Sequence, residues 1–290
     1  MSPPYVLALG LHARSLWIFE ALDVLAPFRK ASRRLKAVSV SGDKWFRLSV
    51  DVFFLKAFDP WVLSCLLSEV EAVFIDRYRM LGGELIRSAE LLDFRQDGSG
   101  VQARIRQGAE VQTLNAELLV GADGVGSTVR EQLGIGFKGV DYSEHFLLAD
   151  VPWDAAPWSN DRSHGFLQEE GLLLALPLPQ GWRLIMARRE PPETPFSLAP
   201  FSERLTSILG DVPDLGEPRW LSQFSVQRRL AQHFRRNRVF LAGDAAHVQS
   251  PLGAQGMNTG LADAFNLSWK LAFYLKGFGQ GALLDSYEQE

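Results

Sequence analysis

Hydrophobic and polar positions along the chain follow two different periods, which predict a mixture of helices and strands. Apolar residues recur at helical spacing in several segments, which we expect to form helices: residues 12–25, 62–81, 201–209, 257–275 and 283–290. Gly82-Gly83 and Gly277 follow two of these segments, where glycine commonly ends a helix. Within 257–275, apolar or small residues predict a continuous buried face at positions 261, 264, 265, 268, 271, 272 and 275.

Short apolar runs bounded by turn residues predict strands between these helices. They lie at residues 84–94, 101–106, 118–120, 146–151, 171–176, 182–187 and 238–242. Asp97-Gly98-Ser99-Gly100 separates the first two runs and has the composition of a hairpin turn. Within 142–229 such runs alternate with Pro-rich loops, so we expect a sheet-rich inserted domain there. Residues 1–141 and 230–290 together would form the second domain.

The composition excludes several classes of partner. The chain has 290 residues, 47% of them hydrophobic and 22% charged, as in ordinary globular proteins. A net charge of -4 and a pI near 5.8 give no attraction to nucleic acid or to an anionic membrane. Cys65 is the single cysteine, so no intrachain disulfide can form and we expect a cytoplasmic protein. The five histidines lack the spacing of metal ligands, so we expect no metal site.

One stretch combines a buried strand, a Gly-Asp turn, a Gly-rich loop and a helix. The strand runs into Gly243 and Asp244, which would put a carboxylate at its carboxyl end, where open α/β sheets bind ligands. Such a carboxylate can accept hydrogen bonds from sugar or ribityl hydroxyls. Gly253 and Gly256 would let backbone amides approach a flat ligand closely. The helix beginning near Met257 would direct free N–H groups and its positive dipole end at that ligand, as suits a reduced flavin.

Two further stretches carry candidate binding residues. A predicted strand leads into Asp123 and Gly124, and Ser127 suits the N-cap of a short helix that Gly134 ends. By itself Asp-Gly, like Gly-Asp, is only a turn signal. Arg14 lies in a helical segment near the N-terminus, where a lone arginine is as often a solvated surface residue as a ligand of phosphate.

Together these stretches resemble the flavoprotein hydroxylases typified by para-hydroxybenzoate and phenol hydroxylases. The Gly243-Asp244 stretch is similar to the second flavin-binding motif of that family, which implies that Asp244 binds the sugar and ribityl region of FAD. The resemblance also implies a set of residues lining the isoalloxazine: Pro251, Gly253, Gly256, Met257 and Asn258. Asp123 and Gly124 resemble the family's Asp-Gly fingerprint, implicated in holding FAD and NAD(P)H, and Arg14 would meet the FAD pyrophosphate.

The sequence departs from the family pattern at its N-terminus. The family opens with a strand and a Gly-x-Gly-x-x-Gly turn that places the pyrophosphate on a helix N-terminus, and no such turn is present. Leu7 and Leu67 stand where the family often has arginine and glutamine. We therefore expect an α/β (mixed α+β) fold: an incomplete Rossmann-like FAD-binding domain, lacking the first βαβ unit and the C-terminal region, with an inserted mixed β-sheet substrate domain. Such a chain should bind FAD weakly or not at all unless another chain supplies that unit.

The resemblance implies an FAD- and NAD(P)H-dependent monooxygenase that hydroxylates an aromatic, phenolic small molecule with O₂ through a flavin C4a-hydroperoxide. Because the flavin carries the chemistry, we assign no catalytic side chain. The substrate would lie between the loop 251–258 and the inserted sheet, where Phe166, Leu174 and Trp182 are candidates, although plain core residues are the simpler interpretation. The alternatives are a related epoxidase, halogenase or reductase, and a truncated, flavin-free remnant or partner-completed module. A homodimer is also left open.

Overall fold

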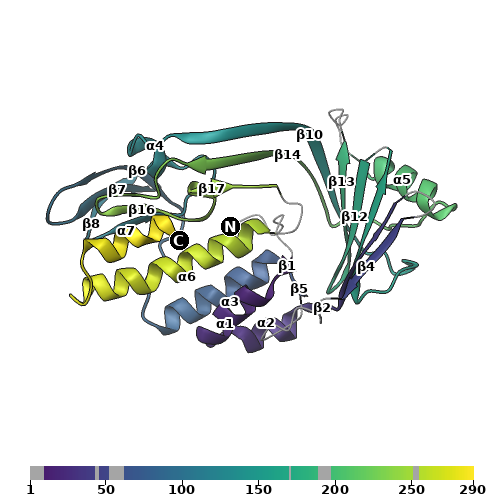
Figure 1. The fold of residues 1–290 in the computed structure, drawn as a ribbon, viewed down its shortest axis with the longest axis horizontal. Helices are drawn as coiled ribbons and strands as arrows, with labels where there is room; N and C mark the ends of the chain where they lie inside the picture. The colour runs from purple at the N-terminus through teal and green to yellow at the C-terminus, as the bar shows by residue number, and fades with distance from the viewer. Residues whose placement is uncertain (1–9, 43–45, 52–61, 170, 189–196, 251–254) are drawn as a thin grey trace. The chain divides into compact units, whose positions relative to one another are not determined.

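A computed structural model describes residues 10–42, 46–51, 62–169, 171–188, 197–250 and 255–290 (Figure 1). The chain divides into two compact units. The first comprises residues 1–74 and 142–226, and the second comprises residues 75–141 and 227–290. Among the described residues, no helix is long and apolar enough to cross a bilayer.

The first unit begins with two short helices in place of the single helix expected over residues 12–25. Helix α1 spans Ala13–Ala21 and α2 spans Leu25–Ala31. They are separated at Asp23, whose φ of 58° is left-handed, a conformation that aspartate tolerates better than most residues. Phe19 and Phe28 pack with Phe74, with ring centroids 4.4–5.7 Å apart, so aromatic contacts hold the helices together.

A small antiparallel sheet follows these helices, in the order β1 (Gly10–Leu11), β5 (Val62–Ser64) and β2 (Arg33–Leu35). The helix expected over 62–81 is therefore wrong in its first part: only α3 (Leu67–Met80) is helical. Strand pairing on both sides of β5 outweighs the apolar spacing there. The Ser64 hydroxyl also donates to the Pro177 carbonyl at 2.7 Å, which fixes β5 further.

The main sheet of the first unit is mostly antiparallel. Its order is β10 (Phe137–Val151), β13 (Gly181–Arg188), β12 (Gly171–Leu178), β11 (Arg162–Gln168), β3 (Ala37–Ser41) and β4 (Arg47–Asp51). Strand β14 (Trp220–Ala231) lies beside β10, and β3 pairs with β11 in parallel. Strands β3, β4, β11 and β14 were not expected from the sequence. Strands β10 and β14 have residues in both units.

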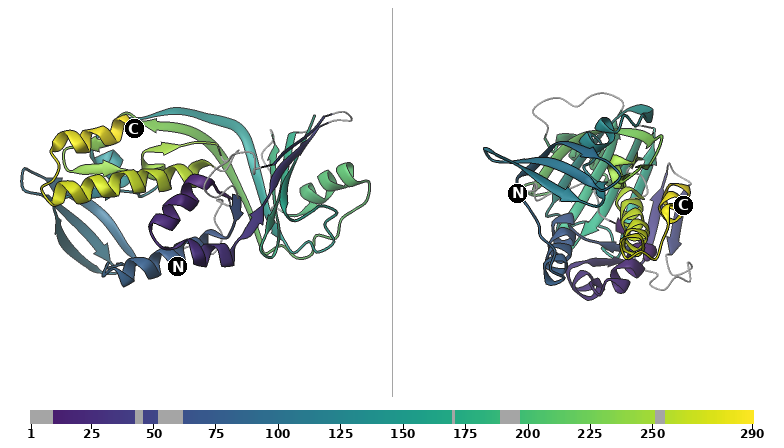
Figure 2. Two further views of the ribbon diagram at one scale, coloured as in Figure 1. Left: turned by 60° about the horizontal axis from the view of Figure 1, so that its bottom comes forward. Right: turned by 90° about the vertical axis from the view of Figure 1, so that its left-hand side faces the viewer.

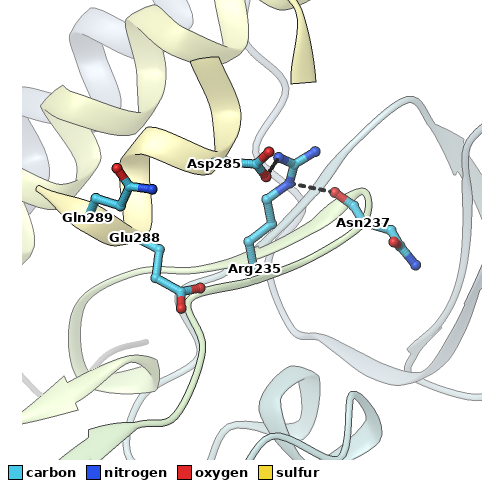
Figure 3. Close-up of a pocket in the computed structure, with 5 residues that line it drawn as sticks. All are labelled: Arg235, Asn237, Asp285, Glu288 and Gln289. Atoms are coloured by element: carbon cyan, nitrogen blue, oxygen red, sulfur yellow. Dashed lines mark hydrogen bonds and ion pairs between the residues drawn. The ribbon is translucent and has the colours of Figure 1, made fainter. Parts of the chain in front are cut away.

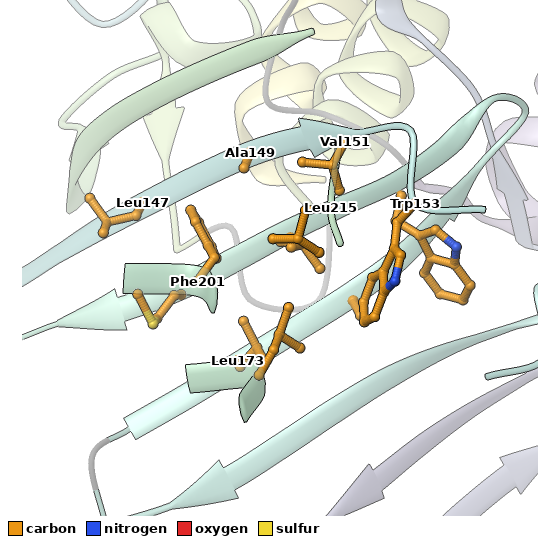
Figure 4. Packing of buried hydrophobic residues seen from close by; sticks show 12 residues of the cluster. Leu147, Ala149, Val151, Trp153, Leu173, Phe201 and Leu215 are labelled. Atoms are coloured by element: carbon orange, nitrogen blue, oxygen red, sulfur yellow. The ribbon is translucent and has the colours of Figure 1, made fainter. Parts of the chain in front are cut away.

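The two faces of this sheet carry different clusters. Helix α5 (Ala199–Leu209) contributes Phe201 and Leu205 to one cluster, which contains buried residues of β10, β12 and β13 (Figure 4). Trp182 belongs to that cluster and Phe166 packs against it. The other cluster is built on a different set of residues: Phe146, Leu148, Ile185 and Val226, with Leu174 and Phe224 packed against them. Because side chains alternate between the faces of a strand, Leu174 and Phe166 have separate surroundings.

The second unit contains a three-stranded meander of β6 (Ala89–Gln96), β7 (Val101–Gln107) and β8 (Glu110–Ala116). The expected hairpin turn is confirmed, because Asp97 Oδ1 accepts hydrogen bonds from the backbone N–H groups of Ser99 and Gly100. Strand β8 was not predicted. All its residues are exposed, so no apolar alternation marks it in the sequence.

A second small sheet in this unit has the order β15 (Arg235–Arg236), β16 (Val239–Leu241) and β9 (Leu119–Gly121). Strands β16 and β9 are parallel, and the short helix α4 (Thr128–Gln132) contributes to the core beside them. The parallel and antiparallel strands, combined with helices, confirm the mixed α/β class. The domain division expected from the sequence stays a prediction.

Two helices end the chain, α6 (Gln255–Leu275) and α7 (Gly281–Gln289), which lie side by side (Figure 2). The buried face expected on α6 is wrong in part. Several of its positions are exposed: Ala264, Ser268, Ala272 and Leu275. Leu267 and Lys270 are buried instead, because Phe240 and the α7 residues Leu284 and Tyr287 cluster with Leu267. The glycine expected to end α6, Gly277, has a left-handed φ of 76°.

Candidate functional site

The predicted Gly-Asp turn lies at the carboxyl end of β16. Ala242 is still extended, Gly243 has a left-handed φ of 60°, and the 3-10 turn η2 spans Gly243–Ala245. Glycine adopts this φ more easily than any other residue, so residue 243 lets the chain turn sharply after the strand. Since β16 and β9 are parallel, the turn lies beside the Gly121 turn, and the Ala242 N–H donates to the Gly121 carbonyl at 3.0 Å. The structure thus brings the two candidate motifs together.

The backbone of the Gly243–Asp244 turn is held on several sides. Its Gly243 N–H donates to Asp263 Oδ2 at 2.9 Å, and the Arg130 guanidinium donates to the Ala245 carbonyl at 2.9 Å. The short strand β17 (His247–Val248) follows and pairs with β14. These contacts hold the backbone on both sides of Asp244.

The Asp244 carboxylate is the group in this turn that has no partner among the described residues. It accepts no hydrogen bond from any described residue. Partial burial raises its pKa above the ordinary value for aspartate, and the charge of His247 counteracts part of that effect. Asp244 is an exposed residue, so its carboxylate is accessible to hydrogen bonds from ligand hydroxyls.

The other predicted carboxylate, Asp123, is used within the protein. It accepts hydrogen bonds from the Ser127 hydroxyl at 2.5 Å and from the Val129 N–H at 3.1 Å. The Ser127 hydroxyl in turn accepts from the Arg130 N–H at 3.0 Å, which confirms Ser127 as the N-cap of α4. Asp123 therefore organises its own turn, and its role in binding FAD stays a prediction.

Gly124 and Arg130 complete the first motif. Gly124 has a left-handed φ of 81°, and a Cβ atom added there would meet no atom within 4 Å, so this part of the turn is open. Arg130, which is 5% exposed, was not predicted as a site residue. It donates to the Val125 and Ala245 carbonyls and lies over the Phe137 ring at 3.9 Å, so it joins the two turns.

The N-terminus of α6 lies next to this site in sequence and begins at Gln255, slightly before the expected start. Gly256 and Met257 are partly exposed and Asn258 is buried. A Cβ atom at Gly256 would meet nothing within 4 Å, so the first turn has open space beside it. Its N–H groups and dipole favour negative charge in that space. Pro251 and Gly253, which were also predicted to line the ring, lie outside the described residues.

Helix α6 approaches the Gly-Asp turn closely one helical turn later. A Cβ atom at Gly260 would lie 3.4 Å from the Cα of Gly243, so the two glycines allow a contact between backbones. Further along the chain, Gln249 Nε2 donates to the Thr259 hydroxyl at 3.2 Å. These contacts place α6 against the turn that carries Asp244.

Sequence reasoning missed the pair formed by Asp263 and His247. His247 Nε2 lies 2.6 Å from Asp263 Oδ2, and each side chain is 14% exposed. The hydrogen bond with Asp263 raises the pKa of His247 above the ordinary value. A signal was available, because Asp263 is the only acidic residue in the 21 residues of α6.

Arg14 and the residues that line the described cavities are not part of the Gly243–Asp244 turn. Arg14 is an exposed residue in the first turn of α1, in the first unit, and its role stays a prediction. One cavity, of about 360 Å³, is lined by Arg235, Asn237, Asp285, Glu288 and Gln289, with Arg235 bonded to Asp285 and to the Asn237 carbonyl (Figure 3). Another, of about 560 Å³, lies at the β6–β7 hairpin. Their linings are polar and charged, and neither includes a predicted flavin residue.

The described residues fit part of an FAD molecule. Asp244 offers a free acceptor for ribityl or ribose hydroxyls, and the first turn of α6 offers donors for a ring that gains negative charge. For the pyrophosphate, the sequence has no Gly-x-Gly-x-x-Gly turn. The described residues therefore supply an acceptor at Asp244 and backbone donors at the first turn of α6, and their role toward FAD stays a prediction.

Comparisons with known proteins agree with this geometry. The aromatic compound monooxygenase YhjG of Bacillus subtilis is 36% identical over 293 residues, which cover 99% of this chain and 58% of that protein. The dialkyldecalin synthase of Streptomyces rugosporus is 37% identical over 227 residues, or 77% of this chain and 48% of that protein. This chain thus spans about half the length of these relatives.

A solved structure and a family model complete the comparison. The ternary complex of aklavinone-11 hydroxylase with FAD and aklavinone has a TM-score of 0.82 at 26% identity, covering 100% of this chain and 59% of that one. The family model described as "FAD binding domain" matches residues 3–290. Because this match extends over nearly the whole sequence, the chain belongs to the FAD-binding-domain family that includes the aromatic-compound monooxygenases.

Proposed function

We propose that this chain forms part of an FAD- and NAD(P)H-dependent monooxygenase that hydroxylates a phenolic small molecule with O₂. The observation that supports this most directly is the Asp244 carboxylate, which is fixed at the end of β16 and left without a partner among the described residues. Family membership and the names of relatives such as an aromatic compound monooxygenase support the reaction class.

In this proposal, each part of the site has a separate task toward FAD. Asp244 accepts hydrogen bonds from the hydroxyls of the sugar or ribityl chain. Gly256, Met257 and Asn258, in the first turn of α6, face the ring and stabilise negative charge on it. Asp123 keeps the neighbouring turn in shape through Ser127. Bound FAD would supply the redox chemistry, with NAD(P)H as the reductant and O₂ as the oxidant: one oxygen atom enters the aromatic ring and the other leaves as water.

For the substrate, we propose the sheet face of the first unit opposite α5. Its Phe146 and Phe224 rings stack at 5.4 Å with an interplanar angle of 19°, next to Leu148 and Ile185. Phe146, Leu148 and Ile185 are buried, so a substrate ring would reach this face beside the partly exposed ring of Phe224, where offset stacking is favourable. Leu174 belongs to this face, whereas Phe166 and Trp182 pack in the α5 cluster and would serve as core.

Titration with FAD tests the cofactor assignment. We expect weak but saturable quenching of flavin fluorescence by the wild-type chain, in keeping with the weak binding expected from the sequence. The affinity should be lower by about tenfold or more in Asp244→Ala, since a hydrogen bond to a charged group contributes about 1.5–3 kcal/mol. Asp211→Asn, which changes an exposed carboxylate of the first unit, should bind as the wild type does. Equal affinities of the wild type and Asp244→Ala would refute the assignment.

Absence of saturable FAD binding by the wild type would favour the flavin-free alternative instead. The dialkyldecalin synthase among the relatives adds a reason to measure substrate oxidation separately from flavin binding. NAD(P)H oxidation by the flavin-loaded chain, followed with phenols as substrates, tests the reaction class. The cytoplasmic location and the homodimer stay predictions.

A further inference from the structure

Asp263 holds the Gly243–Asp244 turn from the side of α6. Its Oδ2 atom accepts hydrogen bonds from the Gly243 N–H at 2.9 Å and from His247 Nε2 at 2.6 Å. Both side chains of the Asp263–His247 pair are largely buried, so water competes weakly for these bonds. One carboxylate oxygen thus ties together the start of η2, the start of β17 and the middle of α6.

The hydrogen bond between the Gly243 N–H and Asp263 restrains the turn that carries Asp244. Gly243 is left-handed and packs against Gly260, so the turn has no side chain of its own to fix it. The Gly243 N–H that Asp263 binds belongs to the residue directly before Asp244. The bond to Asp263 holds the peptide between Ala242 and Gly243, and so limits rotation of the backbone that leads into Asp244.

Charged groups around His247 come from several elements. Asp244 of η2 and Asp263 of α6 both lower the energy of its protonated form. Tyr287 of α7 interacts with Asp263, and its hydroxyl donates to the Leu241 carbonyl. The nearby cations have other partners: Arg229 of β14 is bonded to Asp141 and Gln227, and Arg130 of α4 is bonded to the Ala245 carbonyl.

We propose that Asp263, together with His247, is a positioning pair that holds the Asp244 carboxylate in the pose that binds flavin hydroxyls. Asp263 sets the backbone of the turn, and His247 lies close enough to Asp244 for its protonated form to favour the ionised carboxylate. The pair does not contact the ligand itself. This inference rests on the proposed flavin site.

A first experiment needs no flavin. Asp263→Asn keeps the size of the side chain and an oxygen acceptor for the Gly243 N–H but removes the charge. NMR titration should show the pKa of His247 falling in Asp263→Asn, and the pKa of Asp244 rising in His247→Gln, because each group loses an opposite charge. Unchanged titration of His247 or of Asp244 in these variants would overturn the proposal.

A second experiment is a double-mutant cycle on FAD affinity. Asp263→Asn should weaken binding by about fivefold to twentyfold in the wild-type background, a typical coupling between residues in contact. In the Asp244→Ala background the same substitution should cause no further loss, because the carboxylate that it positions is gone. An equal loss in both backgrounds would show that Asp263 acts through the general fold, and would contradict the inference. Urea unfolding of each variant confirms that it is folded.

The two experiments separate two kinds of failure. If the wild type binds no FAD but the titrations shift as expected, the proposed cofactor is wrong, and the pair is retained as the control of the Asp244 charge. If FAD binds and depends on Asp244, but the titrations and the cycle show no coupling to Asp263, the flavin site is retained and the positioning pair is rejected.

Discussion

Asp123 and Asp244 occupy similar places, each in a turn that follows one of two neighbouring parallel strands. Their surroundings differ in one respect that decides their use. The protein satisfies Asp123 with a hydroxyl and a backbone N–H, whereas Asp244 has no such partner among the described residues. The first carboxylate therefore shapes a turn, and the second is available to a ligand.

The raised pKa of His247 makes a prediction about stability. A histidine whose pKa is higher in the folded state stabilises that state fully below its unfolded pKa, near 6.5, and loses this contribution as the pH rises through the folded pKa. Wild type should therefore exceed His247→Gln by about 1.5–3 kcal/mol in the free energy of unfolding below that pH, the range for a hydrogen bond between charged groups. The difference should shrink in alkaline solution.

Urea unfolding of both proteins across this pH range measures the difference directly. A gap that stays constant with pH would show that the imidazole contributes by packing, against Phe234 for example, and not through its charge.

At the residue level, the sequence predicted the groups that stand in short local patterns. Asp244, Ser127 and Gly277 were found because a turn, an N-cap and a helix end depend on neighbouring residues. Asp263 and Arg130 were missed because their partners are distant in sequence: Asp263 binds a residue 20 positions away, and Arg130 one 115 positions away. Such contacts depend on how the strands and α6 pack together.

At the level of elements, helices with strong spacing were predicted well, and strands without it were not. The predicted helices over 201–209 and 257–275 differ from α5 and α6 by at most two residues at each end. Strand β8 has no buried residue, and the residues of β5 form a strand only because β1 and β2 pair with them. The buried side of α6 was misjudged because α7 determines which side is covered. In each of these elements, the segment that packs or pairs with it determined its structure or its buried side, and the local sequence pattern did not.

Strands β10 and β14 approach each other closely at Gly139. A Cβ atom there would lie 1.8 Å from the carbonyl oxygen of Arg228 and 2.7 Å from the Cα of Arg229. Backbone atoms cannot move aside cheaply, so Gly139→Ala should destabilise the protein by about 1–3 kcal/mol or more. Gly126→Ala is a matched control, because a Cβ atom there meets nothing within 4 Å. Chemical denaturation should show a clear loss for the first variant and about 0.5 kcal/mol or less for the second; equal effects would show that the crossing is looser than the structure indicates.

At the level of the whole molecule, the chain builds separate cores. The cluster under α5 and the cluster around Phe146 belong to the first unit, and those around Val239 and Phe240 belong to the second. The candidate flavin residues of the Gly-Asp and Asp-Gly motifs all lie in the second unit, whereas the proposed substrate face lies in the first. A substitution in the core of one unit should therefore affect the binding function placed in that unit and leave the core of the other unit intact.

The buried ion pair between Asp150 and Arg183 offers the sharpest test of this separation. The two side chains are 3% and 1% exposed, and their paired hydrogen bonds measure 2.6 and 2.7 Å. The Arg183 guanidinium also lies 5.2 Å from the Trp220 ring. Asp150→Ala removes the counter-charge that accepts both of these hydrogen bonds from the buried guanidinium, so it should cost about 3–5 kcal/mol. The double variant Asp150→Leu/Arg183→Met removes both charges and should recover much of that loss, because buried ion pairs replaced by apolar residues of similar volume are often neutral or stabilising.

Hydrogen exchange followed by mass spectrometry shows which strands the substitution Asp150→Ala destabilises. Asp150→Ala should accelerate exchange in β12 and β13, which share a sheet with Asp150, and leave the meander β6–β8 of the second unit at its wild-type rate. Because the meander is held by its own strand pairing, its protection does not depend on the ion pair. Faster exchange in both units to the same extent would mean that they unfold as one cooperative body, and the division into separately stabilised cores would then be wrong.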